Sequence, residues 1–425
     1  MTNLPEEFIL QTRQLMGEER FNRYLEAFEE EAPVSIRVNP KHRGKHRGTV
    51  PCVSSAADNT GTVPSVQVSS VQKVPWCPEG YYLSERPQFT FDPLFHAGCY
   101  YVQEASSMFI THIIRSLASR LSFIISPLSI LDLCAAPGGK STAAISVLPE
   151  GSTMVSNEPI PNRAQILLEN ITKWGYPNCT VTNNYPRDFR KAKAKFDIII
   201  CDVPCSGEGM FRKDPATIGE WSMQNVEKCW RLQREIVADA WECLNPGGIL
   251  IYSTCTFNTK ENEENVRYFM EEFDAEILDI PTEPSWNITG SLLEGFDAPV
   301  YRFIPGITRG EGLFICALRK SGESNHSYPL STISSKLRVL TPDLPEGDYP
   351  RIDIPYQDAL KFLRGEAIVL PPDTPKGIVT VTYQGFALGP AKNIGNRANN
   401  LYPKPWRIKT THLPTEPVDI IKFKE

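Results

Sequence analysis

Two cysteines stand where short apolar runs end, and their thiols could do covalent chemistry. Cys205 follows the run 196–201 within Pro-Cys-Ser-Gly, and Cys255 follows the run 249–253 within Thr-Cys-Thr. If the two runs are neighbouring parallel strands, they lie about 5 Å apart and both thiols emerge at the same edge of the sheet. A lone buried cysteine is usually inert, but a pair at adjacent strand ends indicates a reactive site.

A pair of thiols beside a carboxylic acid suits the methylation of a pyrimidine ring at C5. That carbon is a poor nucleophile. A thiolate that adds to C6 makes C5 nucleophilic, and the thiolate leaves after a base has removed the C5 proton. The attacking cysteine requires a lowered pKa. Asp202, three residues before Cys205, could donate a proton at N3 of the base. Spacing alone leaves open which cysteine attacks.

A loop of mostly small residues, Asp-Leu-Cys-Ala-Ala-Pro-Gly-Gly-Lys-Ser, occupies positions 132–141. Small residues let a ligand approach the main chain, and the following helix presents free N–H groups that suit a carboxylate. A P-loop requires glycine where Cys134 stands, and the dinucleotide fingerprint is absent. The loop therefore favours S-adenosylmethionine, with Glu158, after the run 153–157, on the ribose hydroxyls. The predicted loop contacts are Cys134, Ala135, Ala136, Pro137, Gly138, Gly139 and Lys140.

Apolar, β-branched runs alternate with longer helical stretches between residues 129 and 320. The predicted strands are 130–134, 153–157, 180–183, 196–201, 249–253 and 312–318. The predicted helices are 140–147, 161–174, 223–244 and 260–273. This alternation indicates βαβ units and a mostly parallel sheet. Ligands of such sheets bind outside the carboxyl ends of the strands, where the small-residue loop and both cysteines fall.

Segments on either side of this region differ in kind. Residues 1–35 have a helical apolar stripe, and residues 41–75 begin with a basic run and continue as a surface loop or inserted ribbon. Residues 377–388 alternate as a β-hairpin does. Within the predicted helix 260–273, the acidic cluster 261–264 is expected to be a solvated first turn, where the helix dipole favours acids.

The charge distribution and the cysteines limit which classes of protein the chain can belong to. The net charge of −6 does not by itself indicate a polyanionic partner. The stretch 374–415 nevertheless has no Asp or Glu, and its six basic residues are Lys376, Lys392, Arg397, Lys404, Arg407 and Lys409. No apolar run is long enough to span a bilayer. The 11 cysteines are scattered without a zinc spacing, so we expect free thiols in a reducing cytoplasm and no metal.

Several strings together resemble the bacterial ribosomal-RNA cytosine-C5 methyltransferases of the Nol1/Nop2/Sun family, especially the F-type enzymes that act on 16S rRNA. Besides the small-residue loop and the two cysteine motifs, the matching strings begin at Ser35, Val74, Leu94, Asn157 and Gly310. They cover most of residues 34–320. Shorter strings beginning at Gly385 and Asn399 resemble the PUA-like module of that family.

The resemblance implies a role for each matching residue. Cys255 is implied to be the nucleophile, and Cys205 the residue that assists product release. Asp202 is implied to be an acid shared between cofactor and base, and Lys140 to lie near the base. The implied cofactor contacts are the loop 134–140, Glu158, Arg163, Asn184 and Asp202. Asn184 stands where many relatives carry an aspartate near the adenine.

The resemblance also implies an architecture. We expect an N-terminal RNA-contacting region (1–110), a Rossmann-like methyltransferase domain with a seven-stranded, mostly parallel sheet (111–322), an intermediate module (323–372) and a PUA-like RNA-binding module (373–425). The implied strand order is 3-2-1-4-5-7-6, with the last-added strand antiparallel.

The expected partner is RNA, namely 16S rRNA or the small ribosomal subunit, and the expected state is a monomer away from membranes. A flipped or single-stranded cytosine is the favoured target, because the base must leave its stack to reach a buried thiol. The alternatives are a transfer-RNA cytosine methyltransferase, a DNA cytosine methyltransferase, which usually attacks from the Pro-Cys motif, and a non-catalytic RNA-binding factor of ribosome assembly.

Overall fold

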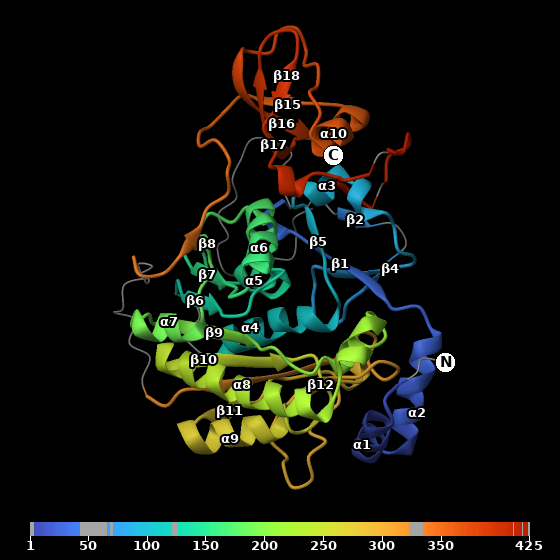
Figure 1. Cartoon of the computed structure of the whole chain (residues 1–425), viewed down its shortest axis with the longest axis vertical. Coiled ribbons are helices and arrows are strands. Elements are labelled where there is room, and N and C mark those ends of the chain that lie inside the picture. The colour runs from blue at the N-terminus through green and yellow to red at the C-terminus, as the bar shows by residue number, and fades with distance from the viewer. Residues whose placement is uncertain are drawn as a thin grey trace.

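The computed structural model describes residues 4–42, 66–68, 71–120, 126–322, 335–410, 412–418 and 420–423. The basic run at 41–47 therefore lies mostly outside the described residues. A mixed sheet forms the centre of the molecule (Figure 1). Its strands are β6 (Ser129–Asp132), β7 (Thr153–Asn157), β8 (Cys179–Thr182), β9 (Phe196–Asp202), β10 (Leu244–Thr254), β11 (Glu276–Leu278), β12 (Tyr301–Phe303), β13 (Leu313–Arg319) and β14 (Val339–Leu340).

The strand order along this sheet is β11-β13-β10-β9-β6-β7-β8-β14, with β12 paired to β13. Counted along the chain from β6, this is the predicted order 3-2-1-4-5-7-6, and β13 runs antiparallel to β10 as expected. Two short strands add to the predicted seven, since β14 pairs antiparallel with β8 and β12 with β13. The fold class is confirmed.

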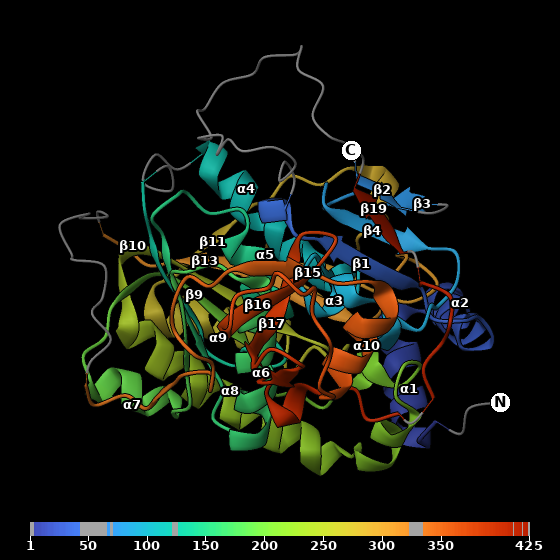
Figure 2. The same cartoon turned by 90° about the horizontal axis from the view of Figure 1, so that it is seen from above.

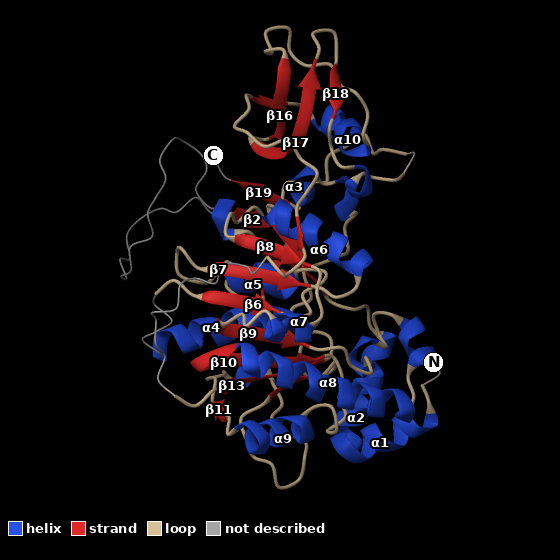
Figure 3. Ribbon diagram, turned by 60° about the vertical axis from the view of Figure 1, so that its left-hand side comes forward, coloured by secondary structure: helices blue, strands red, loops and turns tan. Residues whose placement is uncertain are grey.

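Helices cover both faces of the sheet (Figure 3). One face carries α4 (Phe109–Arg120), α5 (Gly139–Ile145) and α6 (Pro161–Trp174), and the other α7 (Pro186–Lys191), α8 (Met223–Cys243) and α9 (Glu263–Phe273). The strand β9 shows why both faces are covered. Ile198 and Ile200 pack in the first core, and Ile199 and Cys201 in the second. A continuous apolar run is typical of such doubly buried strands.

The N-terminal part combines two helices, α1 (Glu6–Met16) and α2 (Glu18–Glu26), with a second sheet. Its strand order is β3-β4-β1-β5, from β3 (Val71–Lys73), β4 (Gly80–Leu83), β1 (Val34–Val38) and β5 (Tyr100–Val102), and the short helix α3 (Pro93–His96) precedes β5. Buried Arg37 of β1 donates to Gln103 Oε1 at 2.7 Å and to Thr142 Oγ1 of α5 at 2.6 Å. These bonds attach the second sheet to the helix that follows the small-residue loop.

The C-terminal part forms a small β module above α3 and α6 (Figures 1 and 2). It contains β15 (Arg351–Asp353), α10 (Tyr356–Arg364), β16 (Gly377–Tyr383), β17 (Phe386–Asn393) and β18 (Ala398–Asn400). The predicted hairpin is confirmed, since β16 and β17 pair antiparallel. Because β15 also pairs with β16, the module draws strands from both sides of residue 373. The division of the chain into four segments stays a prediction.

Two further short strands, β2 (Val66–Val68) and β19 (Ile421–Phe423), pair antiparallel with each other. Within the described residues, no helix combines the length and apolar character needed to cross a bilayer.

Candidate functional site

The two cysteines lie side by side at the carboxyl ends of β9 and β10. These strands are parallel neighbours, with Ser253 opposite Asp202. We call residues 203–211 the Pro-Cys loop and residues 255–262 the Thr-Cys loop. The Sγ atoms of Cys205 and Cys255 are 3.1 Å apart, and the main-chain N–H of Cys255 donates to Cys205 Sγ at 3.3 Å. The structure thus brings both predicted thiols together.

An ion pair lies beside the thiols. Lys140 Nζ is 2.9 Å from Asp202 Oδ2, and Ser253 Oγ donates to Asp202 Oδ1 at 2.7 Å. Burial by itself lowers the pKa of Lys140, but the nearby carboxylates of Asp202 and Asp132 outweigh it and raise the pKa above its ordinary value. Lys140 is therefore a cation at neutral pH, and it lines the same cavity as both cysteines.

The small-residue loop lies between β6 and α5. Gly138 has a φ of 111°, a left-handed conformation that glycine adopts without strain, and it precedes α5 directly. At the start of the loop, Asp132 is fully buried and accepts a hydrogen bond from Ser141 Oγ at 2.6 Å. Burial raises the pKa of Asp132 to about 7.

A cavity of about 390 Å³ joins these groups. The predicted site residues that line it are Cys134, Ala135, Ala136, Pro137, Gly139, Lys140, Arg163, Asp202, Cys205 and Cys255. The loop and the thiols therefore share one open space, which is large enough for a small ligand beside the cysteines. Three predicted residues, Gly138, Glu158 and Asn184, are not part of its lining.

Glu158 lies behind the loop and is only 1% exposed. Its Oε1 accepts the main-chain N–H of Ile160 at 3.0 Å, whereas its buried Oε2 accepts no hydrogen bond. Arg163 Nη2 lies 3.6 Å from that oxygen and donates to the main-chain oxygen of Ala136 at 2.9 Å. Arg163 thus connects Glu158 with the cavity wall.

Asn184 is held by Arg338, the residue just before β14. Its Nδ2 donates to the main-chain oxygen of Arg338 at 3.1 Å, and its Oδ1 accepts the main-chain N–H of Arg338 at 2.9 Å. Both side-chain groups are therefore engaged outside the cavity. A contact between Asn184 and the adenine stays a prediction.

Sequence reasoning missed several residues of the cavity wall. Gln103, Glu104, Lys213 and Glu311 all line it. All four fall in strings that resemble the family, but nothing in their spacing assigned them a role. Gln103 and Glu104 reach the cavity through folding of the N-terminal sheet, Glu311 through the segment before β13, and Lys213 through the segment that follows the Pro-Cys loop.

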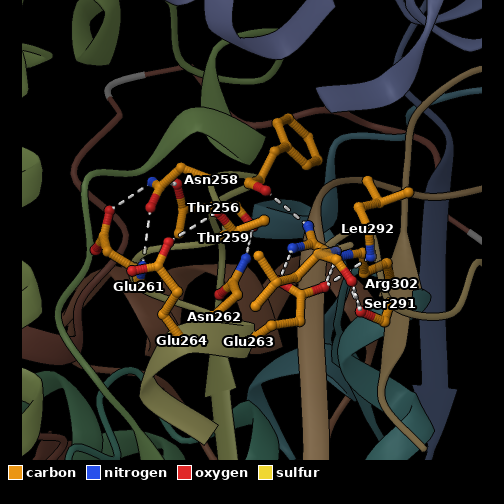
Figure 4. Close-up of polar contacts among 12 residues, drawn as sticks. Thr256, Asn258, Thr259, Glu261, Asn262, Glu263, Glu264, Ser291, Leu292 and Arg302 are labelled. Atoms are coloured by element: carbon orange, nitrogen blue, oxygen red, sulfur yellow. Dashed lines mark hydrogen bonds and ion pairs between the residues drawn. The ribbon is translucent and has the colours of Figure 1, made fainter. Parts of the chain in front are cut away.

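The expectation of a solvated acidic first turn at 261–264 was wrong for two of its acids. Glu261 and Glu263 are both 0% exposed. Glu263 forms an ion pair with buried Arg302, whose Nη1 donates to the main-chain oxygen of Phe257 at 2.7 Å (Figure 4). The helix dipole favours acids near a helix start whether they are exposed or buried, and here the side chains of Glu261 and Glu263 point into the packing around the Thr-Cys loop.

The six basic residues of the stretch 374–415 belong to the C-terminal part. All are exposed except Arg407, which is half-buried. Arg407 donates to the main-chain oxygen of Tyr402 at 3.2 Å. The basic stretch therefore presents five charged side chains to solvent.

Three family models match successive parts of the chain. Residues 4–105 match the N-terminal domain of 16S rRNA methyltransferase RsmF, residues 127–319 match 16S rRNA methyltransferase RsmB/F, and residues 349–408 match the methyltransferase RsmF PUA domain. The models follow one another in the order of the N-terminal sheet, the central sheet and the C-terminal module.

Curated relatives carry a matching description. The ribosomal RNA small subunit methyltransferase F of Pectobacterium atrosepticum is 34% identical over 288 residues, which cover 64% of this chain and 57% of that protein. The protein of the same name from Erwinia tasmaniensis is 30% identical, over 74% of this chain and 63% of its own length. The matched region thus spans less than two thirds of either relative.

Solved structures share the fold. A methyltransferase homolog protein from Pyrococcus horikoshii has a TM-score of 0.57 and 25% identity, over 75% of this chain and 96% of that one. NSun6 from Pyrococcus horikoshii, solved with SFG, has a TM-score of 0.54 and 21% identity, over 75% and 99% of the two chains.

Proposed function

We propose that this chain, which belongs to the RsmB/F family of 16S rRNA methyltransferases, methylates C5 of a cytosine in 16S rRNA. In this proposal S-adenosylmethionine is the methyl donor, Cys255 is the nucleophile and Cys205 assists release of the product. The substrate is the RNA alone or the small ribosomal subunit, and the chain acts as a monomer in the cytoplasm.

The observation that carries the proposal is the pair of thiols beside an ion pair. The Sγ atoms of Cys205 and Cys255 are 3.1 Å apart, and Lys140 and Asp202 pair at 2.9 Å in the same cavity. Addition of a thiol to C6 of a cytosine and removal of the C5 proton occur on adjacent ring atoms. Two thiols in contact can therefore serve both steps on one bound base.

The residues present fit S-adenosylmethionine, which would supply the methyl group when bound. Glu158 Oε2 is a buried acceptor without a hydrogen-bond partner at the end of β7, which suits a ribose hydroxyl. Gly139 lines the cavity, and because it has no Cβ, a ligand can approach its main chain. The loop 134–140 would hold the methionine end, with Arg163 beside it.

The residues of this chain would then divide the work on the base. Cys255 gives its thiol proton to the Asp202 carboxylate as its sulfur bonds to C6, and Asp202, oriented by Ser253 and Lys140, passes that proton to N3. Lys140 retains its positive charge and pairs again with the carboxylate once the proton has left. After transfer of the methyl group, the C5 proton passes to the Cys205 sulfur while the Cys205 thiol gives its own proton to the departing Cys255 sulfur. The bond between Cys255 and C6 breaks in this elimination, which Cys205 thereby assists. The hydrogen bond with Cys255, followed by burial, raises the pKa of Cys205, so Cys205 stays a thiol while Cys255 attacks.

The experiment is methyl transfer from labelled S-adenosylmethionine to 16S rRNA and to small subunits, with Cys255→Ala and Cys205→Ala beside the wild type. We expect Cys255→Ala to lose labelling at least a thousandfold and Cys205→Ala to accumulate a covalent protein–RNA adduct. RNA that contains 5-fluorocytidine should trap the wild-type protein as a covalent adduct. The fluorine at C5 cannot leave as a cation in the way that a proton does, so the elimination step stops. Cys229→Ala, outside the cavity, is the matched control.

The outcomes separate the alternatives. An active Cys255→Ala beside an inactive Cys205→Ala would reverse the roles, as in a DNA-type enzyme. Labelling of transfer RNA in place of 16S rRNA would reassign the substrate. RNA binding by the wild type without methyl transfer to either substrate would identify a ribosome-assembly factor.

A further inference from the structure

Two buried carboxylates cross between the loops that carry the cysteines. Glu208 belongs to the Pro-Cys loop and is 2% exposed, and Glu261 belongs to the Thr-Cys loop and is 0% exposed. In the described part of the chain, neither carboxylate has a Lys or Arg within ion-pair distance. A buried carboxylate destabilises the fold unless hydrogen bonds satisfy it. The donors around Glu208 and Glu261 therefore show what each carboxylate holds in place.

Glu208 reaches from its own loop to the other. Its Oε2 accepts the main-chain N–H groups of Phe257 at 2.7 Å and Asn258 at 2.9 Å, just after Cys255. Its Oε1 accepts Trp221 Nε1 at 3.0 Å. The carboxylate of the Pro-Cys loop therefore holds the main chain of the Thr-Cys loop.

Glu261 makes the reciprocal connection. Its Oε2 accepts the main-chain N–H of Ser206, next to Cys205, at 3.1 Å, and Gln233 Nε2 at 2.7 Å. Gln233 Nε2 also donates to the main-chain oxygen of Pro204 at 2.9 Å. The carboxylate of the Thr-Cys loop therefore holds the main chain on both sides of Cys205.

Asn258 joins the two carboxylates. Its Nδ2 lies 3.1 Å from Glu208 Oε1 and 2.8 Å from Glu261 Oε1, and Figure 4 shows its amide directed at Glu261. Between the loops, Ser206 Oγ and Thr256 Oγ1 are 2.8 Å apart. Each member of the cysteine pair is thus flanked by a residue bonded to the opposite loop.

We propose that Glu208, Glu261 and Asn258 form a clasp that holds Cys205 and Cys255 at the separation their shared reaction needs. These are positioning residues, because none of them lines the cavity. The inference rests on the proposed function for its role in the reaction, but the geometry of the clasp can be tested without RNA. Loosening it should affect the step that needs both thiols more than the step that needs Cys255 alone.

The first test uses diamide, a two-electron oxidant, as a probe of proximity in the free protein. The two thiols lose two protons and two electrons to diamide and form one disulfide bond. Peptide mapping of alkylated protein follows the Cys205–Cys255 disulfide with time. We expect Glu261→Gln and Asn258→Ala each to slow its formation at least tenfold. The NH2 group of a glutamine at position 261 would face other donors, either Asn258 or the pair Ser206 and Gln233. Alanine at position 258 removes the amide that joins the two carboxylates.

The control is Glu79→Gln, which neutralises another buried carboxylate, one bound to Arg115 at 2.8 Å and remote from the loops. Glu79→Gln should form the Cys205–Cys255 disulfide within twofold of the wild-type rate, although it also lowers the stability of the fold. Asn258 is only half-buried, so Asn258→Ala provides the test if Glu261→Gln does not fold. Wild-type disulfide rates in Asn258→Ala would overturn the proposal.

The second test is kinetic. With 16S rRNA as substrate, Asn258→Ala should lower kcat at least tenfold, change KM for RNA less than twofold and leave a covalent protein–RNA adduct. A purely structural role predicts instead a loss of activity that matches the loss of thermal stability, as in Glu79→Gln, with no adduct. Failure of the wild type to methylate RNA would count against the proposed function, whereas the diamide rates would still decide the clasp.

Discussion

Asp132 shows how one buried group can make stability depend on pH. Its carboxylate is fully buried, Oδ2 accepts from Ser141, and Oδ1 has no hydrogen-bond partner. A pKa of about 7, against an ordinary 3.8, means that the folded protein binds this proton more tightly than the unfolded chain does. The stability that Asp132 contributes is therefore complete below about pH 4 and is lost as the pH rises through about 7.

Replacement Asp132→Asn should remove this dependence. The melting temperature of the variant relative to the wild type should rise steadily between pH 4 and pH 7. The difference in unfolding free energy should change by up to about 4 kcal/mol, since each pKa unit corresponds to about 1.4 kcal/mol. Thermal unfolding without cofactor at pH 5, 6, 7 and 8 measures it. A difference that stays constant across this range would contradict the assignment.

At the scale of elements, the position of the small-residue loop depends on a contact outside the central sheet. Arg37 of β1 is 1% exposed, bonds to Gln103 and Thr142, and lies 4.5 Å from the centre of the Trp174 ring. It thereby connects β1, α5 and α6. The N-terminal sheet is thus a support for the helix that follows the loop.

Replacement Arg37→Met should weaken this support. It fills much of the same volume but leaves Gln103 Oε1 without its buried donor, at a cost of about 1–3 kcal/mol. We expect a lower melting temperature together with weaker binding of S-adenosylmethionine by calorimetry, because α5 begins at Gly139. Arg115→Met, on α4 and away from the loop, is the control for stability. A variant with unchanged affinity despite its lower melting temperature would show that β1 does not position the loop.

At the scale of the molecule, net charge conceals a local excess. The chain carries −6 overall, yet Lys376 and Lys392 are exposed on the C-terminal module in a stretch without acids. If that module binds RNA, the double reversal Lys376→Glu with Lys392→Glu should weaken binding and reduce the slope of log affinity against log salt by about 1.4, or ~0.7 for each phosphate contact.

Filter binding of 16S rRNA at several salt concentrations measures this slope. The matched control is Lys191→Glu with Lys193→Glu, which reverses two exposed lysines near α7. Equal effects of the two double variants would mean that binding follows net charge rather than the module.

The small-residue loop and the pairing of the two cysteine motifs could be predicted from local patterns in the sequence, whereas the order of the central strands was implied by the family resemblance. A doubly buried strand such as β9 has an apolar run, and parallel neighbours such as β9 and β10 bring the residues after them to one edge. Cys205 and Cys255 therefore met as expected, although they stand 50 residues apart.

Only the tertiary structure decided what surrounds those motifs. Glu261 looks like any acid near a helix start, and its burial follows from the Pro-Cys loop, Gln233 and Asn258 packing around it. Likewise, the sequence shows Arg37 only as a basic residue in a strand, and its partner Thr142 is decided when β1 packs against α5. Periodicity reports which face of an element is apolar, but it does not report which distant donor will satisfy a buried charge. That choice is made when the elements pack, because desolvation makes each unmatched polar group costly.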